Sequence, residues 1–105
     1  MLEKASFVVS GLATRTKAHA WPPFRRKRLA LRQLLRALFG QYAIDTVIDV
    51  GANRGQFAKF LRYEVGFKGR LVSFEPNPML YSDLSRISRH DASWQVLPFA
   101  LARES

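Results

Sequence analysis

Apolar and polar positions change from strand-like to helical spacing and back again in the second half of the chain. A short apolar run over 46–50 is interrupted only by Asp49, and this is typical of a buried strand. Apolar residues recur at helical spacing over 57–65, and a second apolar run over 71–74 is closed by Glu75. The order predicts a parallel strand–helix–strand unit with a glycine turn after its first strand.

Residues 25–40 predict a basic amphipathic helix, which Gly40 is expected to end as a C-terminal cap. Arginines run down one flank of this helix. The apolar face beside them consists of Leu31, Leu34, Leu35 and Leu38. Residues 1–24 show no sustained period, so we expect them to form a flexible N-terminal segment.

Asn77 is expected to cap a helix that starts at Pro78, because an amide oxygen can accept the first free backbone N–H groups. The buried face of that helix is expected to hold Leu80, Leu84 and Ile87. A third strand is predicted over 94–101. Pro98 inside it cannot donate to a ladder, which indicates a strand at the edge of the sheet.

Length and composition narrow the class of protein. The chain has 105 residues, room for one domain, and its 48% hydrophobic content can bury a small core. It has no cysteine, which excludes a disulfide framework and a cysteine nucleophile. His19 and His90 lack companions at metal-ligand spacing, so we expect no metal site. No apolar run is long enough to span a membrane and no convincing signal peptide is present, so we expect a cytoplasmic protein.

The net charge of +9 is concentrated in the N-terminal part of the chain. Residues 1–40 carry nine basic side chains against Glu3 alone, whereas residues 41–105 carry eight basic and seven acidic side chains. Three roles are open for the basic helix Arg25–Phe39. It can pack its leucines on the sheet with its arginines in solvent, contact an anionic membrane surface, or contact nucleic acid phosphates. No aromatic interleaving supports nucleic acid.

The glycine turn has the form D-x-G-x-N-x-G, from Asp49 to Gly55. A dinucleotide fingerprint needs glycine at the first, third and sixth places, which here hold Gly51, Asn53 and Gln56. The missing third glycine disfavours a dehydrogenase. A carboxylate two places before the first glycine suits a cofactor that carries a positive group.

The segments VIDVGANRGQFA, GRLVSFEPNP and WQVLPFALA resemble the FkbM family of class I S-adenosylmethionine-dependent methyltransferases, over roughly residues 44–102. The resemblance implies a Rossmann-like α/β fold, S-adenosyl-L-methionine as cofactor, and a hydroxyl of a small molecule or glycan as acceptor. It implies cofactor-binding roles for Asp49, Gly51, Asn53, Gly55 and Glu75. It identifies no catalytic residue.

Two of these carboxylates have alternative roles that the sequence leaves open. Asp49 either orients the methionine end of the cofactor or caps the glycine turn through backbone amides, and a carboxylate in a buried strand is costly unless it is paired. Glu75, 24 positions after Gly51, either accepts both ribose hydroxyls or serves as a turn carboxylate before Pro76.

The resemblance also implies an incomplete domain. The family's sheet has seven strands, whereas residues 41–105 supply about three, so we expect a truncated methyltransferase domain. Strand 46–50 would then have an open edge that favours self-association. Two functions follow: the N-terminal cofactor-binding part of an O-methyltransferase, or a truncated, non-catalytic remnant or small binding protein that uses its basic helix.

Overall fold

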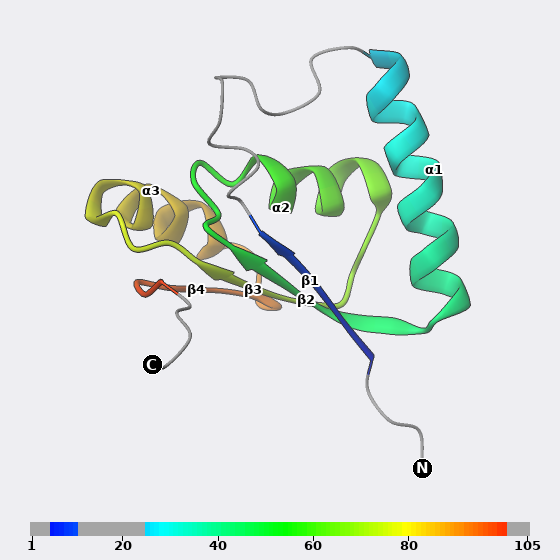
Figure 1. The fold of residues 1–105 in the computed structure, drawn as a ribbon. Coiled ribbons are helices and arrows are strands. Elements are labelled where there is room, and N and C mark those ends of the chain that lie inside the picture. Colours follow the sequence, from blue (N-terminus) through cyan, green and yellow to red (C-terminus); the bar gives the residue numbers. More distant parts are fainter. Residues whose placement is uncertain (1–4, 11–24, 101–105) are drawn as a thin grey trace, which may run out of the picture.

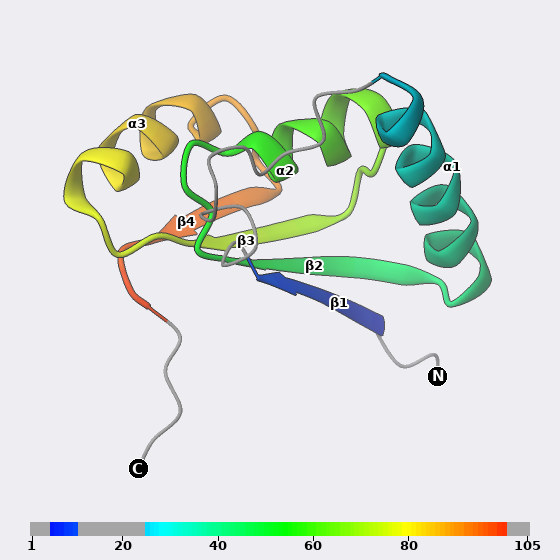
Figure 2. The same ribbon diagram turned by 45° about the horizontal axis from the view of Figure 1, so that its top comes forward.

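The computed structural model describes residues 5–10 and 25–100, which form a parallel sheet with its helices on one face (Figure 1 and Figure 2). The elements in chain order are β1 (Ala5–Ser10), α1 (Arg25–Gln41), β2 (Ile44–Val50), α2 (Gln56–Phe60), the π-helical segment η2 (Leu61–Val65), β3 (Arg70–Phe74), α3 (Pro78–Ser88) and β4 (Trp94–Leu97). The strand order is β1-β2-β3-β4, and every pair is parallel. The predicted α/β class with a parallel sheet is confirmed, and the arrangement is compatible with a Rossmann-like fold.

The first strand differs from the prediction. We expected residues 1–24 to lie outside the sheet as a flexible segment, but residues 5–10 form β1 and pair with β2. The predicted open edge on strand 46–50 is therefore wrong, because β1 covers it and the sheet has four strands instead of three. Residues 1–4 and 11–24 lie outside the described residues. The segment Phe7–Val9 is too short to show a period, and pairing with β2 satisfies backbone groups that would otherwise face water.

The core lies between the sheet and its three helices. Val47, Leu71 and Trp94 are aligned across β2, β3 and β4 and are all buried. From the helical layer, the core receives Leu35, Phe39, Ala58, Phe60, Leu61 and Leu84. The ring of Phe39 packs edge-on against two other rings. The ring centroids are 5.2 Å apart for Phe7 of β1 and 5.3 Å apart for Phe67. Through these contacts α1 joins β1 to the strand–helix–strand unit.

Helix α1 packs on the sheet mainly through the predicted face, since Leu31, Leu35 and Leu38 are at least partly buried, but Leu34 and the end of the helix differ from the prediction. Leu35 and Phe39 are buried, whereas Leu34 is 54% exposed. The helix continues through Gly40 to Gln41, and the left-handed residue after it is Ala43, with φ of 50°. Arg36 donates from Nε to the carbonyl of Val65 at 2.9 Å, so the guanidinium of this arginine contacts the protein and does not face solvent alone. No helix within residues 25–100 is both long and apolar enough to cross a membrane.

Helix α3 and strand β4 begin at the predicted residues, Pro78 and Trp94. The Asn77 side chain accepts from the N–H groups of Met79 and Leu80 at 2.9 and 3.2 Å, which confirms it as the N-cap of α3. Strand β4 lies at the sheet edge, as predicted, but ends at Leu97. Pro98 lies just beyond it.

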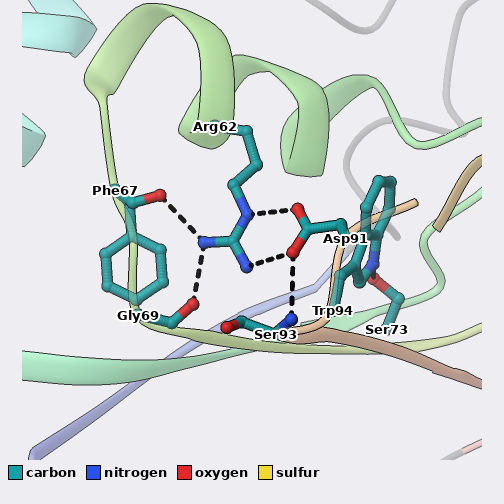
Figure 3. Close-up of polar contacts among 7 residues, drawn as sticks. All are labelled: Arg62, Phe67, Gly69, Ser73, Asp91, Ser93 and Trp94. Carbon is teal, nitrogen blue, oxygen red and sulfur yellow. Dashed lines mark hydrogen bonds and ion pairs between the residues drawn. The ribbon is translucent and has the colours of Figure 1, made fainter. Parts of the chain in front are cut away.

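A buried arginine joins η2 to the turns that flank β3 and β4 (Figure 3). Arg62 donates to both carboxylate oxygens of Asp91, at 2.8 and 3.3 Å. Its Nη1 donates to the carbonyls of Phe67 and Gly69, at 2.8 and 2.7 Å. Hydrogen bonding from Arg62 holds the pKa of Asp91 below its usual value. These four bonds hold the turn that leads into β3 against η2 and against the turn before β4.

Candidate functional site

The glycine turn leaves β2 with three residues in the left-handed region. Gly51, Asn53 and Gly55 have φ of 71°, 58° and 83°. Such angles are easy for glycine and tolerable for asparagine. The N–H groups of Gly51 and Ala52 both donate to the carbonyl of Phe74, at 2.9 and 3.0 Å. The turn is thereby held against the carboxyl end of β3, which is where parallel α/β sheets bind ligands.

Glu75 follows β3 and is fully buried. Its Oε1 accepts from the N–H of Asn53 at 2.6 Å, and its Oε2 accepts from the N–H of Asn77 at 3.0 Å. The carboxylate therefore ties the glycine turn to the start of α3. This is the geometry expected of a turn carboxylate. The predicted ribose contact would involve the same two oxygens, which an ionised carboxylate presents as acceptors only.

Asp49 lies in β2, two positions before Gly51, on the face of the strand that the helices cover. Its side chain is 1% exposed, and its Oδ2 has no hydrogen-bond partner among the described residues. Burial raises the pKa of Asp49 to about 7, the charge of Glu75 adds to the rise, and a hydrogen bond with Ser73 opposes it. An unpaired carboxyl in this position is unfavourable for folding. The carboxyls of Asp49 and Glu75 thus lie close enough for their charges to interact, and both are buried.

A polar chain behind Asp49 was not predicted. Ser73 is paired with Asp49 in the β2–β3 register and is fully buried. Its Oγ accepts from Nε1 of Trp94 at 3.0 Å and bonds in turn with Asp49. Trp94, Ser73 and Asp49 therefore form a hydrogen-bonded row across three strands. In the sequence, the only sign of this contact is a serine within an apolar strand. That Ser73 lies beside Asp49 follows only from the register of β2 and β3.

The sequence-predicted residues thus come together at one end of the sheet. Gly51, Asn53 and Gly55 shape the turn, while Asp49 and Glu75 lie beneath and beside it. A compact loop with left-handed positions and two nearby carboxyls is compatible with a ribose and a positively charged group. The fit has one condition. Glu75 must become accessible, which requires the Asn53 end of the turn to move.

Gly55 sets the spacing between α2 and α3. A Cβ at this position would lie 2.7 Å from Cδ2 of Leu84, and the backbone has a positive φ. We expect Gly55→Ala to lower the free energy of unfolding by about 1–3 kcal/mol, because both strain and overlap oppose it. Urea unfolding measures the change.

Gly40→Ala is the matched control for Gly55→Ala. It lies in α1, and a Cβ there meets no atom within 4 Å. This variant should be neutral or more stable by up to about 1 kcal/mol, since alanine favours helix. Equal losses of stability in the two variants would contradict the packing role of Gly55.

No protein-family model, curated protein or solved structure matches this chain.

Proposed function

We propose that this chain is the cofactor-binding part of an S-adenosylmethionine-dependent O-methyltransferase similar to the FkbM family. The observation that supports it most is the pair of buried carboxyls, Asp49 and Glu75, at the ends of adjacent parallel strands around a left-handed glycine turn. A purely structural turn does not need Asp49, whose burial opposes folding at neutral pH. A cationic ligand at the turn gives that carboxyl a favourable partner.

The proposal assigns a part to each side chain. Glu75 would accept hydroxyls of the ribose once the Asn53 end of the turn has moved, while it still accepts from the N–H of Asn77. Asp49 would favour the positive methionine end through charge. The backbone of the turn through Gly51, Asn53 and Gly55 would contact the ligand, in left-handed angles that glycine and asparagine adopt readily. S-adenosylmethionine, when bound, supplies a methyl group for transfer to an acceptor hydroxyl. From the resemblance, that hydroxyl belongs to a small molecule or a glycan.

Substitution of Glu75 tests the ribose role. We expect Glu75→Gln to weaken binding of S-adenosylhomocysteine at least about tenfold, because the amide is a weaker, single acceptor and lacks the charge. Glutamine is preferred to alanine since it keeps the side-chain volume and one oxygen for the turn. Isothermal titration calorimetry of the whole chain measures the affinity, and circular dichroism checks the fold.

Arg54→Ala is the matched control, because Arg54 is an exposed residue of the same turn. It should change the affinity less than about twofold. Wild-type affinity in Glu75→Gln would sink the ribose assignment. Saturable binding of NADH in place of S-adenosylhomocysteine would overturn the choice of cofactor.

A second function has a structural observation in its favour. Among the described residues, β1 occupies the place beside β2 where the sequence predicted an open edge. This favours the alternative that the chain is a small binding protein or a non-catalytic remnant of a methyltransferase. A folded, monomeric chain that binds neither S-adenosylhomocysteine nor NADH would support that alternative over the first.

A further inference from the structure

A groove of about 1010 Å³ lies between α2–η2 and α3, on the helical side of the molecule. Its two walls are helix faces with regular spacing. One wall carries Lys59 of α2 and Tyr63 of η2, with Arg54 in the turn before α2, and the other carries residues of α3 three or four positions apart. Both walls are continuous elements, as in grooves that accept a third helix.

Exposed apolar side chains line this groove. Tyr63 and Met79 are 76% and 78% exposed, and Ile87, which was predicted to be buried, is also exposed. Large apolar side chains that gather around one depression mark an interaction site more often than scattered ones do. The flexible side chain of methionine adapts to the shape of a partner, and the rigid ring of tyrosine offers a large contact area. The groove can therefore bury an apolar surface of a partner.

The polar residues of the groove are mainly basic. Arg54, Lys59 and Arg86 stand against the single carboxylate of Asp83, a net charge of +2 with His90 neutral. Arg86 pairs with Asp83 at 2.6 Å, and among the described residues neither Arg54 nor Lys59 forms an ion pair. A ligand for this surface is therefore complementary if it is apolar in its centre and acidic at its flanks.

The walls of the groove are already held in place. Glu75 ties the turn at Asn53 to the start of α3 at Asn77, and the close approach of Leu84 to Gly55 fixes the spacing of the helices. A preformed groove avoids part of the ordering entropy that binding otherwise requires.

We propose that this groove docks an acidic amphipathic helix from a partner protein. Apolar residues at i, i+3 or i+4 and i+7 of that helix would contact Tyr63, Met79 and Ile87. Its carboxylates would lie near Arg54 and Lys59. This binding surface borders the candidate cofactor site at Asn53 but does not include its buried carboxyls, and the proposal does not depend on the proposed methyltransferase function.

A labelled model peptide tests the proposal on the whole chain. The probe is a helical peptide of about 14 residues, roughly 21 Å long, with leucines on one face and glutamates on both flanks. Fluorescence anisotropy should show saturable binding that weakens as salt is added. Lys59→Glu should weaken it at least about tenfold and Met79→Ser about fivefold or more.

Lys68→Glu is the matched charge control, because Lys68 is exposed in the turn before β3 and does not line the groove. It should change the affinity less than about twofold. The proposal is overturned if Lys59→Glu, folded by circular dichroism, binds as the wild type does. It is also overturned if a peptide with lysines in place of glutamates binds equally, or if a single-stranded oligonucleotide binds more tightly and displaces the acidic peptide.

Discussion

Asp49→Asn is expected to remove most of the pH dependence of stability between about pH 4 and pH 7. The pKa of Asp49 rises from 3.8 to about 7 on folding, mainly through burial. Within this window the native carboxyl holds a proton that the unfolded chain has lost. Stability of the wild type therefore falls as pH rises, by about 1.4 kcal/mol per pH unit or about 4 kcal/mol in all. Asparagine does not titrate, so the variant should be the more stable protein near pH 7.5.

Urea unfolding at about pH 4, 5.5 and 7.5 measures this difference, which should grow with pH. Asp45→Asn is the matched control, because Asp45 lies on the same strand and is partly exposed. It removes a carboxyl without touching the buried one, and it should leave the slope with pH unchanged. Asp91 has the opposite effect: because its pKa is lowered on folding, its contribution to stability is lost as the pH falls. This loss occurs at a more acidic pH than the change caused by Asp49. A pH-independent gap between wild type and Asp49→Asn would contradict the burial of a titrating carboxyl.

The same variant bears on function. If Asp49 favours a positive group of the cofactor, Asp49→Asn should bind S-adenosylhomocysteine more weakly while it gains stability at neutral pH. A gain in stability with a loss of affinity is the usual pattern for a residue kept for binding. A gain in stability without any loss of affinity would instead support the capping role that the sequence left open.

Arg62→Ala is expected to destabilise the protein by about 3–5 kcal/mol, since it leaves a partly buried carboxylate and two carbonyls without their donor. The Arg62 side chain is 9% exposed and makes the four hydrogen bonds to Asp91, Phe67 and Gly69 that are among those drawn in Figure 3. Urea unfolding followed by tryptophan fluorescence measures the loss. Arg62→Lys should recover only a part, because an ammonium group cannot match the planar fork of donors.

The exposed pair of Arg86 and Asp83 provides the comparison. It is shorter, at 2.6 Å, but both side chains are more than 60% exposed. Arg86→Ala should therefore change the free energy of unfolding by about 0.5 kcal/mol or less. Similar losses in Arg62→Ala and Arg86→Ala would show that burial is not what gives Arg62 its role. An NMR titration adds a second readout, since the pKa of Asp91 should rise toward its usual value when Arg62 is removed.

Local features of the fold could be predicted because neighbouring residues decide them. Asn77 caps α3 through N–H groups only two and three positions away. The left-handed angles of Gly51 and Gly55 follow from a tight strand-to-helix turn. The spacing of apolar residues likewise identified β2, β3 and the helices between them. Each of these predictions depends on interactions within a few positions of the chain.

Other features depended on which elements meet. The Phe7–Val9 run carries no period, and only the free edge of β2 makes it a strand. Leu34 and Ile87 fit the apolar helical faces that bury Leu35 and Leu84, yet both are exposed because they lie at the edge of the contact with the sheet. Arg62 and Asp91 are 29 positions apart, and no local pattern links them.

The sequence by itself determined the parallel α/β order, the glycine turn and the positions of the two carboxyls at the strand ends. The tertiary structure decided what those carboxyls contact. Glu75 faces two backbone amides, and Asp49 is enclosed beside Ser73 with one oxygen unpaired. The reason is physical: periodicity reports which side of an element is buried, whereas hydrogen-bond partners and dielectric environment arise only when distant segments pack together.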